Sequence, residues 1–177
     1  MQYINHYASP LGGITLGSDG EALLGLWFDG QKYFPDILPK EWKSAELPIF
    51  QQTKRWLDIY FGGDIPRYTP PLRMHGSAFR QCVWKALLEI PYGQTVTYGE
   101  IAGRVVKGYG LGNMSAQAVG GAVGHNAISI IIPCHRVVGA NGSLTGYAGG
   151  ITKKVGLLKL EKANMDKLFV PKEGTAL

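Results

Sequence analysis

The chain has 177 residues, a length that allows one or two small domains, each with a core of its own. Apolar residues make up 45% of the sequence and charged residues 18%, which excludes a wholly disordered protein. No apolar run approaches the roughly 18 residues that span a bilayer, and the N-terminus lacks the pattern of a secretory signal. The two cysteines, Cys82 and Cys134, are too few for a disulfide framework. We therefore expect a cytoplasmic protein without a membrane partner.

Positive charge is concentrated in the second part of the chain. Residues 1–76 hold 7 Lys or Arg against 8 Asp or Glu, and residues 77–177 hold 11 against 5, so the two parts contribute −1 and +6 to the net charge of +5. A polyanionic partner such as DNA is one explanation of this excess. The alternative is a solvated basic helix, because five lysines lie between residues 153 and 167.

The first part of the chain has the pattern of a small β-sheet with one helix. Residues 2–28 hold short apolar runs separated by Gly and Asp turns, which is typical of β-hairpins. Residues 29–48 contain three prolines and are expected to form a loop, whereas residues 49–61 carry apolar side chains at helical spacing. A proline-containing connector follows, and we place the domain boundary near residues 70–77.

The second part begins with three predicted helices, over residues 79–90, from Thr97 to about residue 106, and over residues 114–123. Thr97 and Glu100 have the spacing of a capping box, which marks the start of the second helix. A glycine-rich turn at residues 108–112 separates the second helix from the third, which Asn113 or Ser115 can cap. This order is similar to a helix-turn-helix arrangement.

The third of these helices is rich in alanine and glycine, although each glycine in a helix costs about 1 kcal/mol relative to alanine. Small side chains let another body approach the backbone closely. That body is either a neighbouring helix of the same protein or the groove of a DNA duplex.

The last part of the chain is expected to contain one strand, one hairpin and one helix. The isoleucine-rich run at residues 128–132 predicts a buried strand that ends at Pro133, and Asn141-Gly142 predicts a hairpin with residues 143–145. A helix is predicted over residues 151–163. Residues 166–177 are expected to form a weakly ordered tail.

Cys134 lies next to His135, and these two residue types can form a nucleophile and its base. A thiol becomes a strong nucleophile when a nearby base takes its proton, and a third group that orients the base completes the arrangement. Glu161, on the predicted helix that follows, can serve as this third group. A purely structural role is the alternative for the pair, and Cys82, on the apolar face of a helix, is expected to be buried and inert. The other histidines show no metal-ligand spacing.

The run Ile132-Pro133-Cys134-His135-Arg136-Val137 is a motif of its own, and further segments accompany it. They are residues 96–102 with Tyr98, residues 118–122, Asn126, residues 146–150 and residues 157–161, together with looser matches at residues 9–12 and 25–28. In these segments the chain resembles the O6-alkylguanine-DNA alkyltransferases, also called methylated-DNA–protein-cysteine methyltransferases, whose signature is PCHRV. The resemblance covers nearly the whole chain.

The resemblance implies an α+β protein of two domains. Residues 1–72 are expected to form a ribonuclease H-like domain with a small sheet and a helix, and residues 73–177 a mostly helical, winged-helix-like domain that carries the helix-turn-helix. The implied function is DNA repair. The protein, acting as a monomer, binds double-stranded DNA through the minor groove and rotates the damaged base out of the stack. It then moves the alkyl group of O6-alkylguanine, or of O4-alkylthymine, irreversibly to its own cysteine, once per molecule.

The resemblance also assigns roles to individual residues. Cys134 is the nucleophile, His135 takes its proton through a water molecule, Glu161 holds His135, Asn126 orders the site, and Tyr98 hydrogen-bonds or protonates the leaving guanine. The residues expected to contact DNA are Thr97, Ser115, Ala116, Gln117, Ala118 and Gly121. Those expected to line the alkylguanine pocket are Val138, Tyr147, Ala148 and Gly149. No cofactor is implied, and no zinc is expected, because the extra N-terminal cysteines of zinc-holding relatives are missing.

Three features depart from the family pattern. Gln117 stands where the family usually has an arginine that fills the gap left by the flipped base. The turn at residues 108–112 is longer than in many relatives, and Ala127 stands where a proline often follows the asparagine.

Three other functions compete with alkyl transfer. A protein that binds alkylated DNA without repairing it is expected to lack the cysteine of the signature. A thiol hydrolase using Cys134, His135 and Glu161 is expected to turn over repeatedly on a small substrate. A helix-turn-helix regulator is expected to bind one duplex sequence tightly.

Overall fold

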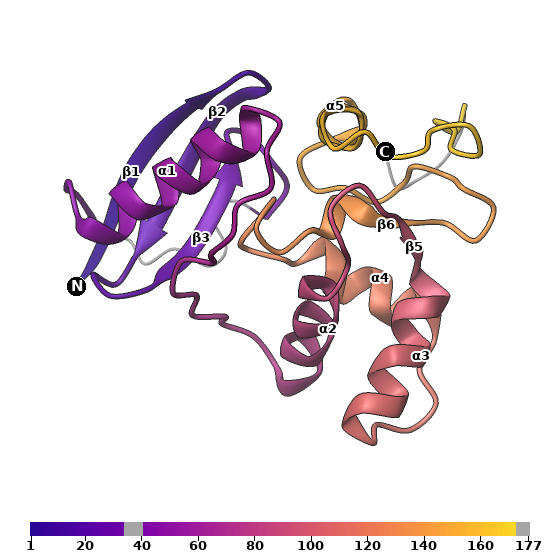
Figure 1. Ribbon diagram of the computed structural model, residues 1–177. Coiled ribbons are helices and arrows are strands. Elements are labelled where there is room, and N and C mark those ends of the chain that lie inside the picture. The colour runs from indigo at the N-terminus through magenta and orange to yellow at the C-terminus, as the bar shows by residue number, and fades with distance from the viewer. Residues whose placement is uncertain (34–40, 173–177) are drawn as a thin grey trace. The chain divides into compact units, whose positions relative to one another are not determined.

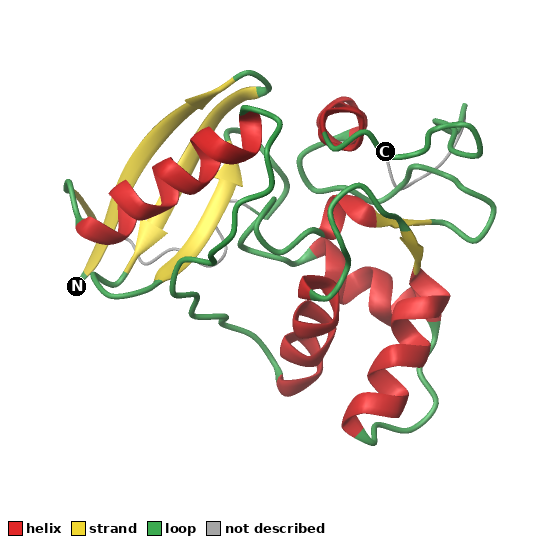
Figure 2. Ribbon diagram, in the orientation of Figure 1, coloured by secondary structure: helices red, strands yellow, loops and turns green. Residues whose placement is uncertain are grey.

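The computed structural model describes residues 1–33 and 41–172. The chain forms two compact units: unit 1 consists of Met1–His75 together with Ala127–Ile131, and unit 2 of Gly76–Asn126 and Ile132–Leu177. Unit 1 is built on a sheet and unit 2 is mostly helical, as Figure 2 shows, so the predicted α+β fold class is confirmed. None of the helices in the two described ranges is long and apolar enough to cross a membrane.

Unit 1 contains the hairpins predicted from residues 2–28. Strands β1 (Gln2–Ser9), β2 (Gly12–Ser18) and β3 (Leu23–Phe28) pair antiparallel, and β4 (Trp42–Ser44) pairs parallel to β1, which gives the strand order β3-β2-β1-β4. Strand β4 lies within residues 29–48, so the prediction of an unbroken loop there is wrong. Residues 34–40 of that segment lie outside the described residues.

Helix α1 (Pro48–Phe61) lies across one face of this sheet (Figure 1). Proline at the first helical position suits the start of a helix, where the backbone N–H has no intrahelical partner. The helix ends at Gly62, as predicted. Its buried side chains are Ile49, Phe50, Thr53, Trp56, Leu57 and Tyr60. The predicted apolar face is therefore the face that packs on the sheet.

Residues Ala127–Ile131 belong to unit 1 because they pair with β3. The Leu26 backbone N–H donates to the carbonyl oxygen of Ala127, and the Ser129 N–H donates to that of Leu26, each over 2.9 Å. The chain then turns at Ile130, whose φ of 69° is left-handed, and the Ile131 N–H donates to the carbonyl oxygen of Ser129 over 2.8 Å. The predicted strand over residues 128–132 is therefore wrong. Only Ile128 forms a bridge, and a γ-turn follows it.

Unit 2 opens with the three predicted helices, α2 (Ala78–Leu88), α3 (Tyr98–Tyr109) and α4 (Ala116–Gly124). The capping box between Thr97 and Glu100 is complete, and Ser115 caps α4, as predicted. The helices pack against one another, and the Trp84 indole N–H donates to the carbonyl oxygen of Ala122 over 2.8 Å. Helices α3 and α4, joined by the long turn, form the predicted helix-turn-helix.

The remainder of unit 2 differs from the prediction at one hairpin. The 3-10 turn η1 (Cys134–Arg136) leads into strand β6 (Val137–Val138), which pairs parallel to β5 (Val96–Thr97). A turn does form at residues 139–143, where the Gly139 N–H donates to the Ser143 carbonyl oxygen over 2.9 Å. The hairpin predicted at Asn141-Gly142 is nevertheless wrong, because Ser143 bridges to Phe169.

Helix α5 (Ile151–Leu160) ends three residues earlier than predicted. A hydrophobic cluster, called the C-terminal cluster below, lies beside it and contains Val138, Leu144, Leu158 and Ala163. The expected weakly ordered tail begins with residues that bridge to this region through Phe169, and its last five residues, 173–177, lie outside the described residues.

Candidate active site

Cys134 is the first residue of η1 and is only 4% exposed. The backbone reaches it through a tight turn around Pro133, in which the Cys134 N–H donates to the carbonyl oxygen of Ile132 over 2.8 Å. Asn126 Nδ2 donates to Cys134 Sγ over 3.2 Å and to the Ile132 carbonyl oxygen over 2.9 Å. One amide thus holds both the sulfur and the backbone behind it, so the structure brings Asn126 to the predicted nucleophile.

Burial raises the pKa of the Cys134 thiol, because a thiolate is costly to form away from water. Three influences oppose this effect: the Asn126 amide, the positive charge of Lys154, and backbone N–H groups of Cys134 and His135. The resting thiol is therefore protonated, but it is surrounded by groups that stabilise the thiolate once a base removes the proton.

His135 is fully buried, and its Nε2 lies 2.6 Å from Glu161 Oε1. Glu161 follows the last residue of α5, so the end of that helix places the carboxylate beside the imidazole. Burial is the largest influence on the pKa of His135 and lowers it, against the opposing effect of Glu161. The imidazole is therefore neutral at neutral pH. When Nε2–H donates to the carboxylate, the basic lone pair is on Nδ1.

Glu161 accepts hydrogen bonds from more than His135. Arg136 Nε donates to its Oε2 over 2.9 Å and Arg136 Nη2 to its Oε1 over 3.0 Å, while the Gly93 N–H donates to Oε2 over 3.0 Å. Burial disfavours the ionised carboxylate, but the hydrogen bonds of His135 and Arg136 and the charge of Arg136 outweigh it and hold the pKa of Glu161 well below its usual range. Glu161 therefore remains an anion that orients His135.

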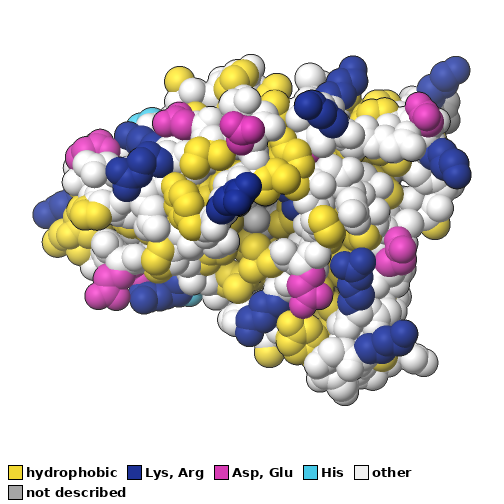
Figure 3. All heavy atoms as spheres, in the orientation of Figure 1, with side chains coloured by type: hydrophobic (Ala, Val, Ile, Leu, Met, Phe, Trp, Pro, Cys, Tyr) yellow, Lys and Arg dark blue, Asp and Glu magenta, His cyan; other side chains and the backbone are white. Residues whose placement is uncertain are grey.

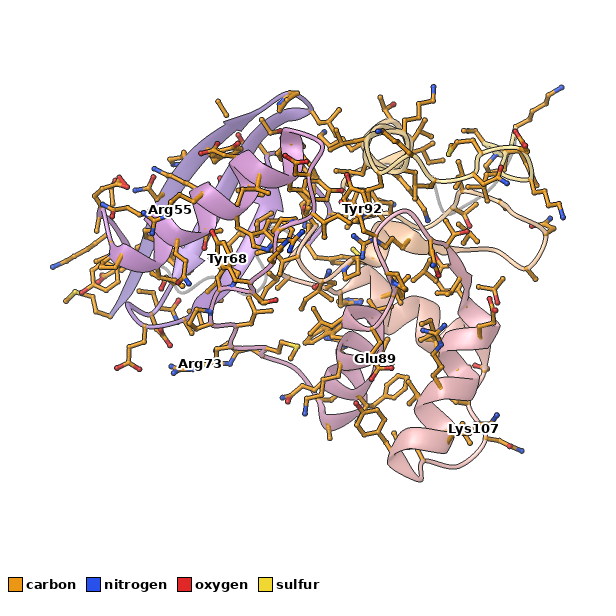
Figure 4. All side chains as sticks on the ribbon, viewed as in Figure 1. Arg55, Tyr68, Arg73, Glu89, Tyr92 and Lys107 are labelled. Carbon is orange, nitrogen blue, oxygen red and sulfur yellow. The ribbon has the colours of Figure 1, made fainter. Side chains whose placement is uncertain are left out.

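Arg136 also binds the turn that follows α2. Its Nη1 donates to the carbonyl oxygen of Ile90 over 2.6 Å, and its Cζ lies 5.8 Å from the ring centroid of Tyr92, which Figure 4 labels. Gly93 has a left-handed φ of 75°, and a Cβ there would lie 2.7 Å from the Glu161 carbonyl oxygen. The turn therefore needs glycine at this position to deliver its N–H to the Glu161 carboxylate.

Lys154 is fully buried, so the alternative of a solvated basic helix is wrong for this lysine. Its Nζ donates to the carbonyl oxygens of Val137, over 2.6 Å, and Thr145, over 2.9 Å. Burial lowers the pKa of Lys154 to about 8, and the Cys134 thiolate has the opposite, smaller effect. The ammonium is therefore still charged at neutral pH and acts on the sulfur electrostatically.

Tyr98, the first residue of α3, binds the same carbonyl group as Lys154. Its Oη donates to the Thr145 carbonyl oxygen over 3.1 Å. Gly146 has a φ of 78°, and a Cβ there would lie 2.8 Å from Tyr98 Oη, so only glycine leaves room for the phenol. Burial, and to a lesser degree the charge of the Cys134 thiolate, raises the pKa of Tyr98 to about 12. The phenol therefore keeps its proton and can donate it to a ligand.

The predicted pocket residues occupy different surroundings. Tyr147 is buried, and its ring meets the His135 ring edge-on with the centroids 6.5 Å apart. Ala148 and Gly149 are half-buried in the loop that follows. The Val138 side chain packs in the C-terminal cluster.

The outer face of α4 gathers five of the six predicted DNA-contacting residues. Ser115, Ala116, Gln117, Ala118 and Gly121 are all exposed. The opposite face, with Val119, Ala122 and Val123, is buried. Thr97 is half-buried and caps α3 instead. These five exposed residues form one surface, on which all side chains are small except that of Gln117.

Packing inside unit 2 does not require glycine along α4. A Cβ on Gly121 or Gly124 would meet no atom within 4 Å, and one on Gly120 would meet the Tyr98 ring at an ordinary 3.9 Å. Tight packing against a neighbouring helix therefore does not account for these three glycines, whereas Ala122 is buried on the inner face of α4.

The segment that carries these surfaces contains no acidic residue. Between Glu100 and Glu161 the sequence has no Asp or Glu, whereas its basic residues are Arg104, Lys107, Arg136, Lys153, Lys154 and Lys159. Lys and Arg side chains are spread over the face shown in Figure 3 and do not form a single patch there. The positive field of unit 2 is therefore broad, which suits an extended polyanion better than a small anion.

Four contributors to the site were missed by sequence reasoning: the side chains of Arg136 and Lys154, the N–H of Gly93 and the carbonyl group of Thr145. Arg136 lies inside the motif, which is a signal that could have found it. Cys82 is half-buried on α2 and not fully buried as expected. Within residues 1–33 and 41–172, no three His, Cys, Asp or Glu side chains lie together so that they could hold a metal ion.

Two family models match the chain. The ribonuclease-like domain of 6-O-methylguanine DNA methyltransferase matches residues 3–70, and the DNA binding domain of the same family matches residues 78–163. A methylated-DNA–protein-cysteine methyltransferase of Haemophilus influenzae is 45% identical over 161 residues, which are 90% of this chain and 86% of that protein. The protein of that name from Mycobacterium tuberculosis is 45% identical, over 88% of this chain and 89% of its own length.

Solved structures from Mycobacterium tuberculosis are similar over the same extent. The crystal structure of OGT in complex with DNA has a TM-score of 0.80 and 42% identity, covering 90% of this chain and 92% of that one. The crystal structure of O6-methylguanine methyltransferase has a TM-score of 0.79 and 41% identity, covering 98% and 97%.

Proposed function

The chain belongs to the methylated-DNA–protein-cysteine methyltransferase family, and we propose that Cys134 is the residue that accepts the alkyl group from O6-alkylguanine in DNA. The observation that carries this assignment is the buried chain of contacts from Asn126 to Cys134 and from His135 to Glu161. It holds the thiol, a neutral base and the group that orients the base within one unit.

In the proposed reaction, Nδ1 of His135 takes the Cys134 proton through one water molecule, and Glu161 stabilises the imidazolium that forms. The sulfur attacks the alkyl carbon, so the S–C bond forms as the bond from that carbon to guanine O6 breaks. The electron pair of the broken bond stays on the guanine, where the Tyr98 phenol donates a hydrogen bond or its proton. The Lys154 ammonium and the Asn126 amide stabilise the thiolate before the attack.

The product is a thioether, which has no good leaving group. Water cannot regenerate the thiol, so each molecule acts once. No step needs an electron carrier or a bound metal, because His135 and Glu161 supply the proton transfer and Asn126 and Lys154 the charge stabilisation.

Duplex DNA is the proposed partner, bound through its minor groove by the exposed face of α4. The groove is roughly 6 Å wide, and a helix that presents alanine and glycine can enter where bulky side chains cannot. Few groups on this face can read base edges, so binding should depend on salt and little on sequence. We retain the predictions of a monomer and of a cytoplasmic location, where a reducing environment keeps the reactive thiol free.

The test is the intact mass of the protein before and after incubation with a duplex that contains one O6-methylguanine. One methyl group should be gained per molecule, and peptide mapping should place it on Cys134 and leave Cys82 unmodified. The Cys134→Ser variant should gain none, and Cys82→Ser should react like the natural protein. Sustained turnover beyond one lesion per molecule would instead support the thiol hydrolase.

A further inference from the structure

The last three residues of α3 and the first part of the turn that follows, residues 107–113, are here called the tip. Helix α3 ends at Tyr109, and Gly110 stops it in the left-handed conformation with a φ of 63°. The chain then runs to Ser115, which caps α4 at the start of the exposed small-residue face. The tip therefore leads directly into the surface proposed to enter the DNA groove.

The tip exposes both a cation and an aromatic ring. Tyr109 is 40% exposed, although an aromatic ring is usually buried. Lys107 is exposed, lies at the outer end of α3 in Figure 4, and forms no ion pair within the described residues. Arg104 is exposed three residues earlier, on the same face of α3, but it shares that face with Glu100, whose pKa is lowered mainly by hydrogen bonds from Thr97 and further by the charge of Arg104. Of the two basic residues Arg104 and Lys107 on α3, Lys107 is therefore the one whose charge is less compensated.

The protein itself makes no use of the bare backbone of the tip. A Cβ on Gly108 or Gly112 would meet no atom within 4 Å, and neither residue has a positive φ. Glycine at these two places is therefore required neither by packing nor by conformation, unlike Gly110. Its effect is to leave the outer surface beside Tyr109 free of side chains.

We propose that the tip is a second DNA contact, in which Lys107 pairs with a backbone phosphate and the Tyr109 ring packs on the deoxyribose beside it. This inference rests on the proposed function, because it extends the α4 surface along the same duplex. DNA is favoured over an apolar protein partner because the tip and its surroundings carry positive charge and no acidic residue from 101 to 160. The phosphate contact lies outside the minor groove, so it adds affinity without reading sequence.

The experiment measures the affinity of the full chain for a 20-base-pair duplex as a function of salt, and separately the rate of alkyl transfer from free O6-benzylguanine base. Lys107→Ala should reduce the slope of log affinity against log salt by about 0.9, the value for one lost phosphate contact. Tyr109→Ala should weaken duplex binding about fivefold without changing that slope, as expected when stacking or packing is lost and charge is kept. Tyr109→Phe should bind like the natural protein.

Two controls separate this inference from others. Lys43→Ala removes an exposed lysine of unit 1 and should leave both the slope and the affinity unchanged. All four variants should react with the free base at the natural rate, because both tip side chains are exposed and far in sequence from Cys134. If Lys107→Ala and Tyr109→Ala bind the duplex as the natural protein does, the tip is no DNA contact, while methyl transfer to Cys134 still stands. If they slow the free-base reaction as much as the duplex reaction, the tip supports the fold and the inference is also wrong.

Discussion

The proposed reaction site and the proposed DNA-binding surface lie in the same unit but are built in opposite ways. Around Cys134 the polar groups are buried and bonded to one another, and Glu161 alone accepts four N–H groups. On the outer face of α4 and on the tip, many residues are alanine or glycine and are exposed, and a Cβ added at most of these glycines would meet no other atom of the unit. Chemistry on a single bond needs groups fixed to fractions of an ångström, whereas a surface that receives a duplex needs room.

This difference can be tested with two substrates. A change in the buried network should affect alkyl transfer from a duplex and from the free base alike, since both reactions use Cys134. A change on α4 or the tip should affect the duplex alone, because the free base needs neither groove binding nor flipping.

The largest effect is expected for Glu161→Gln. The amide cannot balance the charge of Arg136 or stabilise an imidazolium, so transfer to Cys134 should slow by about 100-fold or more on both substrates. The free energy of unfolding should fall by about 3–5 kcal/mol, as when one partner of a buried ion pair is removed. Single-turnover rates and urea unfolding measure both effects. Glu89→Gln, at an exposed helix end, is the matched control, and natural rates in Glu161→Gln would show that His135 needs no orienting anion.

A smaller loss is expected for Lys154→Met, which keeps the length of the side chain but removes its charge. The pKa of Cys134 should rise further, because the positive charge that lowers it is removed, so the thiolate fraction at a given pH should fall. The rate of Cys134 alkylation by iodoacetamide against pH reports this shift directly, with Lys159→Met on the exposed side of α5 as the control. An unchanged midpoint would mean that Lys154 acts only by holding the Val137 and Thr145 carbonyl groups.

The same lysine predicts a pH dependence of stability. Its pKa is about 8 in the folded protein and 10.5 ordinarily, so between these values the unfolded chain binds more protons and stability rises with pH. Across this pH range the free energy of unfolding should rise by about 3 kcal/mol. Below about pH 8 both states are protonated, so this gain in stability is absent. Urea unfolding at about pH 8 and about pH 10 should show the natural protein gaining stability relative to Lys154→Met. If the difference in the free energy of unfolding between the two proteins is the same at both pH values, the Lys154 ammonium is exposed to solvent and the prediction is wrong.

The smallest effect is expected for Gln117, which is exposed at the start of α4. If its amide occupies the gap left by the flipped base, Gln117→Ala should slow duplex repair about threefold, within the modest worth of a neutral hydrogen bond. Gln117→Arg should equal or exceed the natural protein, because charge-assisted hydrogen bonds are about twice as strong. Free-base rates should not change. Equal slowing of both substrates by Gln117→Ala would assign the residue to the fold.

Much of the architecture could be predicted because its signals are local. The capping box at Thr97, the Ser115 cap and the apolar faces of α1 and α2 are each written within a few residues. Cys134 and His135 were predicted to react for a different reason: their adjacency left a structural role open, and the resemblance of residues 132–137 to the family signature favoured a nucleophile and its base.

The failures have a physical cause in common, which is that distant groups decided the outcome. An isoleucine-rich run favours a strand, yet pairing with Leu26 on β3 holds Ile130 in a conformation that β-branched residues avoid. Lys154 lies three and four residues before Leu157 and Leu158, so helical spacing places it on their buried face. The neighbouring residues do not show that the carbonyl groups of Val137 and Thr145 meet its ammonium there.

The segment Ala127–Ile131 limits how far the protein can be shortened. Residues 76–177 contain every residue of the reaction site, and a fragment of that length looks like a minimal alkyl acceptor. Such a fragment would lack β3, and with it the Leu26 groups that bond Ala127 and Ser129. Ile128 and Ile130 would be exposed, and nothing would hold the left-handed turn that sets the path of the chain to Cys134. A truncated reagent therefore has to keep the first 75 residues.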